Sequence, residues 1–321
     1  MIFEKQIKAI FASKLLVRYD DGGTVRYFSA DDFRGLQKEP FEFLGNKGQK
    51  LCGAIYYYGE KSAERLIVFE HGMGGGHLSY MKEIETLAGC GYTVLSYDHT
   101  GCMMSEGENI GGFAQSLADL DFCIRALRER EEYKNLSLSV VGHSWGAFST
   151  LNIGAIHKDI THVVAMSGFV SVKAMLSQFF SGILSIYVPS LYKAECENAP
   201  EYAVYNAIES LAASSCKAMI IHSEDDKTVS FKKHFLKLKA AHEKREGTLF
   251  YSVKGKGHNP NFTADAVAYK DEFFADLTKK AESGYFTTDE IKAEYKASWD
   301  FERMTAQDEN VWNDIVEFLE K

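Results

Sequence analysis

A serine lies between two glycines at a point where a predicted strand meets a predicted helix. The motif GHSWG (142–146) follows the apolar run LSLSVVG (136–142) and leads into a helical stretch beginning WGAFSTLN. So tight a turn lifts the hydroxyl of Ser144 above the sheet, at a helix N-terminus whose partial positive charge favours a developing anion. Glycines two places either side let the backbone pass closely. A serine here could also serve only as a helix N-cap, but the motif and its position together predict a nucleophile.

A serine hydroxyl needs a base to take its proton, and a histidine is the usual choice. The chain has ten histidines. His258 follows Gly255-Lys256-Gly257 directly after the last predicted strand, in a loop that ends at Pro260. His234 and His242 instead fall in a predicted lysine-rich helix (232–244), whose lysines indicate a solvated face, and both are expected to be exposed. His258 is therefore the predicted base.

The acid that orients this histidine should come from the loop after the preceding strand. There CKAMIIH (216–222) opens into three consecutive carboxylates, Glu224, Asp225 and Asp226. Only one is needed to orient the imidazole and stabilise its cation. Spacing favours Asp226, with Val229 returning to the core three residues later. Asp225 is the substitute and Glu224 a weaker one.

Attack on a carbonyl creates an oxyanion, which backbone N–H groups must stabilise. The glycine-rich segment HGMGGGH (71–77) begins at the end of a predicted strand, and glycines let a backbone turn its amides toward a substrate. The predicted donors are the N–H groups of Met73 and of Trp145, the residue after the nucleophile. The rival interpretation is a phosphate-binding loop, but neither G-x-x-x-x-G-K-[ST] nor G-x-G-x-x-G is satisfied here.

The elements that must position these residues alternate along the chain. Short apolar runs are typical of strands buried on both faces, and the helices between them imply right-handed crossovers. The sequence therefore predicts an α/β fold with a mainly parallel sheet and helices on both faces. A Gly/Asn turn predicts an antiparallel hairpin before it. The predicted strands are 40–44, 51–58, 65–72, 92–98, 136–142, 160–168, 216–222 and 248–255, and the predicted helices include 113–131 and a closing one at 308–321.

Two segments interrupt the alternation. Residues 169–215 separate two strands by more than a crossover needs, and residues 262–305 separate the last strand from the closing helix. Long excursions of this kind are usually lids or additional helices. We therefore expect a core of residues 1–168 and 216–321, with a helical insertion at about 262–305, and a cap at 169–215. Apolar residues of the cap, Phe179, Phe180 and Tyr187 among them, could bind substrate or could simply pack a helix face.

Composition excludes several classes of function. Apolar residues make up 45% of the chain and charged residues 25%, and the net charge is −9 with no Lys/Arg-rich stripe. Such a surface disfavours nucleic acid and anionic lipid. The chain has no apolar run of 18 residues, so no stable membrane insertion is expected. Six scattered cysteines show neither zinc nor disulfide spacing, which favours a reducing cytoplasm and implies no metal.

The motifs resemble those of the serine-aminopeptidase-like α/β hydrolases, a family that also holds monoacylglycerol lipases and bacterial carboxylesterases. The matching stretches lie between about residues 40 and 260: HGMGGGHLSY (71–80), YDHTGCMMSEG (97–107), GHSWG, HSEDDKTV (222–229) and GKGH (255–258). The resemblance implies an α/β-hydrolase fold in which Ser144, Asp226 and His258 form a catalytic triad, Met73 and Trp145 give the oxyanion donors, and 169–215 forms the cap. The chain departs from it at Thr100, where the family has Arg, and residues 1–35 match nothing.

These observations predict a serine hydrolase that cleaves a small-molecule carboxylic ester, acyl or aromatic, through an acyl-enzyme and without a cofactor. The same machinery could cleave a thioester or a peptide N-terminus. An aminopeptidase would need acidic residues to hold the substrate ammonium, for which Glu195, Glu197 and Glu201 of the cap are available. A non-catalytic ligand receptor has no need of a base and an acid together, which disfavours it.

Overall fold

The predicted sheet is present, with eight strands in the order β1-β2-β4-β3-β5-β6-β7-β8. The computed structural model describes residues 4–321. Strands β1 and β2 form the expected antiparallel hairpin, β2 pairs antiparallel with β4, and every other pair is parallel. The strands are β1 Leu36–Leu44, β2 Lys50–Tyr58, β3 Arg65–Glu70, β4 Thr93–Tyr97, β5 Ser137–His143, β6 Ile160–Met166, β7 Lys217–Ser223 and β8 Thr248–Val253.

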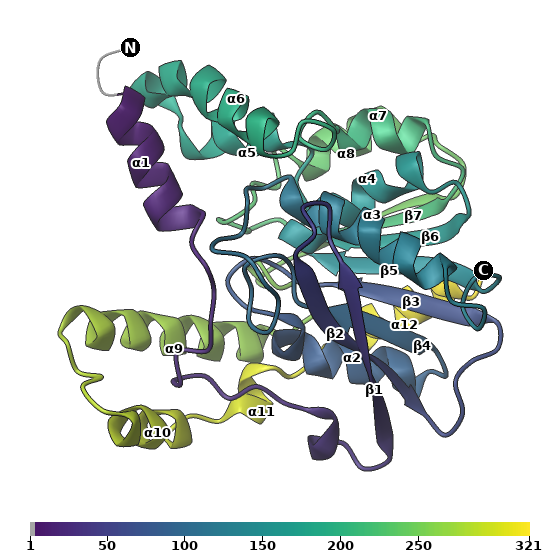
Figure 1. The fold of residues 1–321 in the computed structure, drawn as a ribbon, viewed down its shortest axis with the longest axis horizontal. Helices are drawn as coiled ribbons and strands as arrows, with labels where there is room; N and C mark the ends of the chain where they lie inside the picture. Colours follow the sequence, from purple (N-terminus) through teal and green to yellow (C-terminus); the bar gives the residue numbers. More distant parts are fainter. Residues whose placement is uncertain (1–3) are drawn as a thin grey trace.

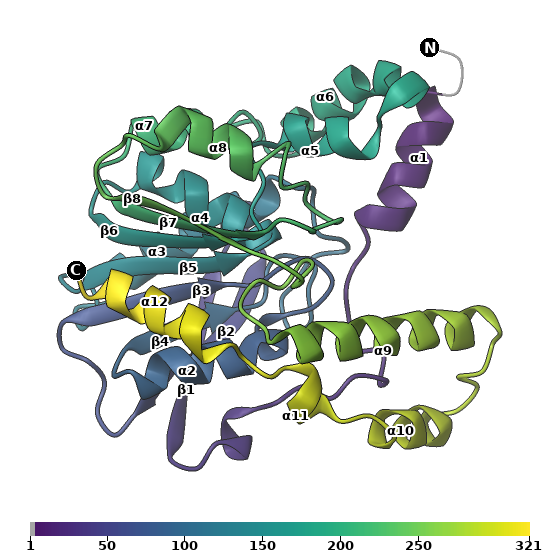
Figure 2. The ribbon, with the colours of Figure 1, turned by 180° about the vertical axis from the view of Figure 1, so that it is seen from behind.

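Helices cover both faces of the sheet, because its central strands are apolar on both sides. In β3, Leu66 and Val68 face one core while Ile67 and Phe69 face the other, the alternation that strand geometry requires. The first core lies under α3 (Gln115–Arg128), α4 (Trp145–Ile156), α7 (Ala207–Ala212) and α8 (Phe235–His242), and the second under α2 (Met81–Gly89) and α12 (Glu309–Leu319) (Figures 1 and 2). The predicted fold class is confirmed.

The lysine-rich helix is shorter than predicted, and its histidines are not exposed. Helix α8 covers only Phe235–His242, and the lysines around it are exposed as expected. His234 and His242, however, are buried. His234 Nδ1 accepts the backbone N–H of Val170 at 3.2 Å, and His242 Nε2 donates to the carbonyl of Ile208 at 2.8 Å. The prediction of exposure was wrong because these imidazoles satisfy backbone groups of a neighbouring segment.

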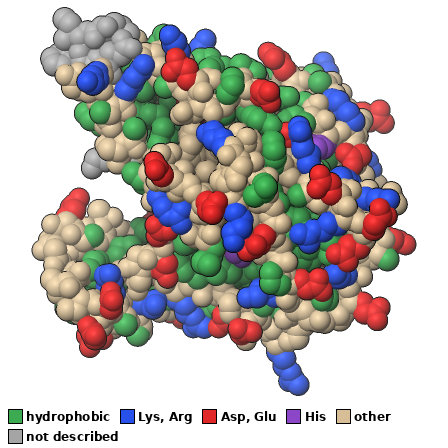
Figure 3. All heavy atoms as spheres, in the orientation of Figure 1, with side chains coloured by type: hydrophobic (Ala, Val, Ile, Leu, Met, Phe, Trp, Pro, Cys, Tyr) green, Lys and Arg blue, Asp and Glu red, His purple; other side chains and the backbone are tan. Residues whose placement is uncertain are grey.

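Two groups of helices project beyond the carboxyl edge of the sheet (Figures 1 and 2). The first holds α1 (Glu4–Leu15), α5 (Val172–Phe179) and α6 (Val188–Asn198), joined by the contact of Phe11 with Phe180 at 5.8 Å between ring centroids. The second holds α9 (Ala264–Glu282), α10 (Asp289–Ala297) and α11 (Phe301–Met304). The outline of the molecule is indented between the two groups (Figure 3).

The two long excursions are therefore helical, as expected. Helix α7, from the end of the first excursion, packs on α4 of the sheet layer rather than beside α6. The division into a core and a cap at 169–215 stays a prediction. Even α9, with 19 residues, is not apolar enough to cross a membrane, and neither is any other helix within residues 4–321.

Candidate active site

The serine of the GHSWG motif occupies a strained turn between β5 and α4. Ser144 has φ 56° and ψ −110°, a conformation that costs energy in a residue with a side chain. A Cβ added to Gly146 would lie 2.3 Å from the carbonyl oxygen of Glu70, and one on Gly142 would lie 2.3 Å from Thr150 Oγ1. Only glycine fits at either position, so the strand and the helix can approach closely enough to hold Ser144 in this turn.

The structure brings the three predicted side chains together. His258 Nε2 lies 2.8 Å from Ser144 Oγ, and His258 Nδ1 lies 2.8 Å from Asp226 Oδ2. The serine follows β5, the acid follows β7 and the histidine follows β8, so the carboxyl ends of three parallel strands supply one hydrogen-bonded line. Such a line lets the imidazole accept the serine proton while the carboxylate stabilises the resulting cation.

Asp226 is held as a carboxylate. Burial alone would raise the pKa of Asp226, but hydrogen bonds from His222, from His258 and from the backbone N–H of Val229 outweigh burial and keep that pKa well below its usual range. The other oxygen, Oδ1, accepts the backbone N–H groups of Thr228 and Val229 at 2.8 and 2.9 Å. The carboxylate oxygen that accepts a hydrogen bond from the proton-bearing Nδ1 of His258 is therefore held in place before any substrate binds.

The two alternative acids have other partners. Asp225 accepts the backbone N–H groups of Gly255 and Gly257 at 2.9 and 3.2 Å, so it shapes the loop that carries the histidine. Glu224 is exposed and lies 3.7 Å from Lys254. Of the three consecutive carboxylates, only Asp226 meets the imidazole of His258.

The loop after β3 lies against the serine. A Cβ on Gly72 would come within 3.3 Å of Ser144 Cβ. His71 is kept neutral because burial lowers its pKa to about 3. Its Nε2 accepts the backbone N–H of His99 at 2.9 Å, so the proton of the ring is on Nδ1. Nδ1 donates this proton to the carbonyl of Gly72 at 2.8 Å. In a trans peptide the N–H points opposite the carbonyl, so the N–H of Met73 points away from His71. Trp145, as the first residue of α4, has an N–H with no partner inside the helix.

A hydrogen-bond chain that the motifs did not reveal links this loop to the histidine loop. His143 Nε2 donates to the carbonyl of His258 at 2.7 Å, so its Nδ1 must accept the hydroxyl of Tyr80 at 2.8 Å. The Tyr80 oxygen in turn accepts the N–H of Gly72 at 3.1 Å. Burial lowers the pKa of His143 to about 3, so His143 stays neutral, as this pattern requires. Tyr80 lies nine residues after His71, but nothing in that spacing predicts its partner.

Replacing Tyr80 with phenylalanine should slow catalysis more than it weakens substrate binding. The change leaves two buried groups, the N–H of Gly72 and Nδ1 of His143, without a partner, which costs about 1–3 kcal/mol of stability. We expect kcat to fall by roughly tenfold with KM little changed, because the loop shifts relative to Ser144. Steady-state kinetics and urea unfolding measure the two effects.

The matched control is Tyr58→Phe on strand β2, which removes a hydroxyl that donates to Glu85 of helix α2 at 2.9 Å. That variant should lose stability alone and keep its kcat. Equal kcat values for Tyr80→Phe and the wild type would show that this chain does not position the site.

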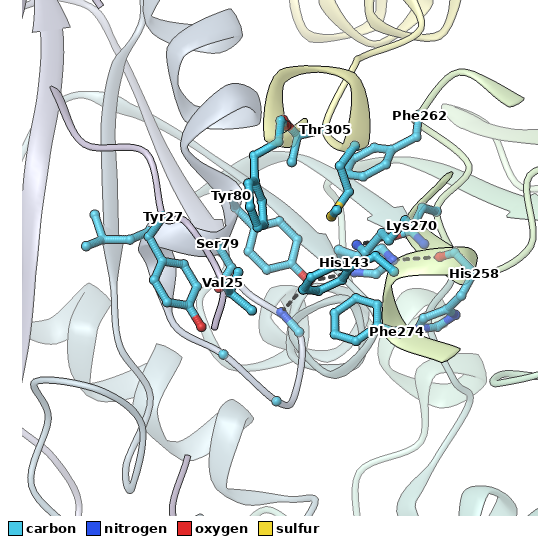
Figure 4. Close-up of a pocket in the computed structure, with 18 of the residues that line it drawn as sticks. Val25, Tyr27, Ser79, Tyr80, His143, His258, Phe262, Lys270, Phe274 and Thr305 are labelled. Carbon is cyan, nitrogen blue, oxygen red and sulfur yellow. Dashed lines mark hydrogen bonds between the residues drawn. The ribbon is translucent and has the colours of Figure 1, made fainter. Parts of the chain in front are cut away.

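Ser144 opens into a cavity of about 360 Å³ whose walls come from unexpected segments (Figure 4). One wall comes from the segment 25–28, for which the sequence predicted no role, and another from α9 and α11 in the 262–305 insertion. Most of the lining is apolar. The apolar and aromatic lining residues are Val25, Tyr27, Phe28, Met73, Leu78, Tyr80, Phe262, Phe273, Phe274, Phe301 and Met304.

The three residues predicted to bind substrate do not line this cavity. Phe179 stacks on Phe113 at 6.1 Å between ring centroids, Phe180 packs against Phe11, and Tyr187 is buried. They pack the helices of the first projecting group, which is the alternative that the sequence left open. Their role in substrate binding stays a prediction.

The acidic residues considered for an ammonium site also lie elsewhere. Glu195 is 2% exposed, and its Oε2 accepts the backbone N–H groups of Phe113 and Ala114 at 2.9 and 3.4 Å, just before α3. Glu197 lies 3.8 Å from Lys193, and Glu201 is exposed. None of the three glutamates lines the cavity at Ser144.

Glu195 should make stability depend on pH. Burial raises the pKa of Glu195 to about 7, above its ordinary value of 4.5. The folded protein keeps this proton where the unfolded chain has lost it, so its contribution to the free energy of unfolding falls as the pH rises from 4.5 to about 7. Glu195→Gln removes this dependence, and across that window the variant should gain on the wild type by about 1.4 kcal/mol per pH unit.

Urea unfolding at several pH values between about 5 and 7.5 measures this difference. Glu197→Gln, at an exposed position two residues away, is the control and should differ from the wild type by a constant amount. A constant difference for Glu195→Gln as well would contradict the assignment.

The N-terminal segment also holds the loop at 100–107, where the sequence departs from the pattern of the family that it resembles. Thr100 donates through its N–H and its hydroxyl to Asp119, both at 2.8 Å. Arg18 donates to the carbonyls of Met103 at 2.6 Å and of Ser105 and Gly107, each at 2.9 Å. Part of the unmatched region 1–35 thus holds this loop, and another part lines the cavity.

Comparison with known proteins places the chain in a family. Residues 61–239, more than half of the chain, match the family described as serine aminopeptidase, S33. The matched region includes Ser144 and Asp226 and ends before His258. No curated protein matches the chain.

Solved structures share the fold at low sequence identity. An esterase of Pyrococcus furiosus, PF2001, has a TM-score of 0.59 and 16% identity over 84% of this chain and 98% of its own. The esterase domain of a Rhodothermus marinus protein has a TM-score of 0.52 and 18% identity, over 76% and 98%. The α/β hydrolase GrgF of a Penicillium species has a TM-score of 0.51 and 15% identity, over 81% and 99%. With its matched sequence and its fold, this chain belongs to the serine aminopeptidase S33 family of α/β hydrolases and is a hydrolase.

Proposed function

We propose that this hydrolase is a serine esterase that cleaves small carboxylic esters through an acyl-enzyme. The single observation that carries the proposal is the line from Ser144 Oγ through His258 to Asp226, with 2.8 Å at each step. A ligand receptor would not need this line. The names of the two esterases among the structural neighbours agree with the proposal.

The first half of the reaction forms the acyl-enzyme. Ser144 Oγ attacks the acyl carbon while His258 Nε2 takes the hydroxyl proton, and the N–H groups of Met73 and Trp145 receive the negative charge on the carbonyl oxygen. The tetrahedral intermediate collapses when His258 returns the proton to the departing alcohol oxygen. Asp226 stabilises the imidazolium throughout.

The second half releases the acid. A water molecule gives a proton to His258 Nε2 and attacks the acyl carbon of the ester formed with Ser144. Collapse of the second intermediate returns the proton to Ser144 Oγ and frees the carboxylic acid. Each donor of the oxyanion site is expected to contribute about 3 kcal/mol to this barrier, as comparable donors do.

The cavity disfavours the aminopeptidase alternative. An N-terminal ammonium needs a carboxylate close to the scissile bond, but Lys270 and Arg26 line the cavity, and Asp271, the one acidic residue among the described residues that line it, is exposed. A thioester remains compatible with the same residues, since only the leaving atom differs. The cavity volume is at the lower end of the range for ligand pockets, which favours short or medium acyl groups.

A panel of substrates tests the proposal. p-Nitrophenyl esters of increasing acyl length and aminoacyl p-nitroanilides are assayed with the purified protein, and a fluorophosphonate probe is used to label its nucleophile. We expect ester turnover with a maximum at short or medium chains, weak anilide turnover and covalent labelling of Ser144. Fast anilide turnover with negligible ester turnover would favour the peptidase, and absence of labelling and turnover would favour the receptor.

A further inference from the structure

An ammonium group lies in the largely apolar cavity beside the candidate triad. Lys270, on α9, lines the same cavity as Ser144 and His258. Figure 4 shows it among Phe262, His143 and His258. Lysines rarely face an apolar cavity without a partner for the charge, because moving an ammonium away from water is costly.

The contacts of Lys270 within the protein leave its charge uncompensated. Its Nζ donates to Asn259 Oδ1 at 3.1 Å and lies 4.8 Å above the ring of Phe262. No carboxylate of residues 4–321 whose side chains are described lies within 4.0 Å of Nζ. Lys256 and Lys82, by contrast, each pair with a carboxylate, on Asp308 and Glu302.

Two carboxylates, Glu83 and Asp271, act electrostatically on Lys270, and the larger influence, that of Glu83, comes from a weak counter-charge. Glu83 is 1% exposed, and Asn261 Nδ2 donates to its Oε1 at 3.1 Å. Burial raises the pKa of Glu83 to about 7. A carboxyl group that is easily protonated cannot fully balance the ammonium, and burial correspondingly lowers the pKa of Lys270.

The other charged residues that line the cavity do not neutralise the ammonium of Lys270. Arg26 is already paired with Asp32 at 2.8 Å, and Asp271 is exposed. Asn259 presents its amide oxygen to Lys270, because an ammonium can only donate, and its Nδ2 has no partner among the described residues. The ammonium and this amide group therefore both line the cavity with N–H groups that can still donate, and a carboxylate accepts from such groups.

We propose that the esters hydrolysed by this protein carry a carboxylate, which binds Lys270 Nζ and Asn259 Nδ2 while the ester carbonyl sits at Ser144. The inference rests on the proposed esterase function and specifies its substrate class. The apolar walls contact the carbon chain between the carboxylate and the ester. An ammonium-bearing substrate would be repelled by the same lysine.

Matched pairs of esters test the charge requirement. On the acyl side, the mono-p-nitrophenyl ester of adipic acid is compared with p-nitrophenyl 6-methylheptanoate, in which an isopropyl group replaces the carboxylate. On the alcohol side, 4-acetoxybenzoate is compared with 4-isopropylphenyl acetate. In at least one pair, we expect kcat/KM of the anionic ester to exceed that of its neutral isostere by about tenfold or more, as a charged hydrogen bond allows.

Three variants connect this preference to the residue. Lys270→Met should reduce the preference by about tenfold or more, because kcat/KM of the anionic ester falls further than that of its neutral isostere. Lys270→Arg keeps a cation and should retain part of the preference. Lys279→Met, the same charge change at an exposed position of α9, should leave both values unchanged. No preference in the wild type, or equal losses for both esters in Lys270→Met, would overturn the inference while leaving the esterase function intact.

A binding measurement separates this inference from the proposed function. Adipate is titrated calorimetrically into the Ser144→Ala protein with and without Lys270→Met. We expect adipate to bind and the lysine substitution to weaken it about tenfold or more. If the wild type hydrolyses no ester, the esterase function fails, and this titration still decides whether Lys270 binds carboxylates. Equal affinities in the two proteins would reject the carboxylate site.

Discussion

Replacing Ser144 with alanine should lower kcat for esters by roughly three to six orders of magnitude. The substitution removes the atom that bonds to the acyl carbon, and no other hydroxyl of the described part of the chain is hydrogen-bonded to His258 Nε2. Stability should change little, because the substitution removes a single hydrogen bond, to His258, and leaves the strained turn at φ 56° as it is. Stopped-flow and steady-state assays with p-nitrophenyl esters measure the loss of kcat.

The control separates the nucleophile from serine loss in general. Ser283→Ala, at an exposed position after α9, should retain turnover and fluorophosphonate labelling. In Ser144→Ala the label should disappear together with turnover. Residual activity above about 1% of the wild type, with labelling elsewhere, would assign the chemistry to another residue.

The strand ends of the fold could be predicted from the sequence, and so could the candidate triad. The apolar runs that become β5, β7 and β8 are recognisable locally, and each candidate residue directly follows one of them. Because parallel strands end at a common edge, their loops must meet there. The strained turn at Ser144 needs glycines at 142 and 146, and those glycines are visible in the motif itself.

The walls of the cavity could not be predicted in the same way. The segment 25–28 and helices α9 and α11 reach Ser144 through their tertiary packing, which no periodic pattern encodes. The apolar residues of 169–215 have the same composition whether they line a pocket or pack α1. Lys270 looks like an ordinary surface lysine of an amphipathic helix until the fold places it beside Asn259.

Buried polar partners were missed for a related reason. Glutamate is usually exposed and histidine is intermediate, so these residue types give no reason to expect Glu195 and His234 to be buried. In the structure each satisfies backbone N–H groups of a segment more than 60 residues away in the chain, at Phe113 and Val170. Such contacts depend on where two loops meet, and a single sequence contains no signal for that.

Replacing Asp226 with asparagine should lower kcat by about four orders of magnitude, the second largest effect expected. The amide oxygen can keep the two hydrogen bonds from the N–H groups of Thr228 and Val229. The NH2 group must then take the place of Oδ2, facing His258 Nδ1 at 2.8 Å. Two donors cannot share that contact, so His258 moves its proton to Nε2.

With its proton on Nε2, His258 donates to Ser144 Oγ and cannot accept the serine proton, so the nucleophile is no longer activated. Substrate binding is not affected by this tautomer, and KM should stay close to the wild-type value while kcat falls. Nuclear magnetic resonance of the imidazole nitrogens reports the tautomer directly.

The adjacent carboxylate provides the matched control. Asp225→Asn makes the same change one residue earlier, where the side chain holds the N–H groups of Gly255 and Gly257 rather than the imidazole. It should lower kcat by no more than about tenfold, because the loop loosens while the proton on His258 Nδ1 keeps its acceptor. If Asp225→Asn costs more than Asp226→Asn, the orienting acid is Asp225, and the hydrogen bond between Asp226 and His258 is not the one that catalysis uses.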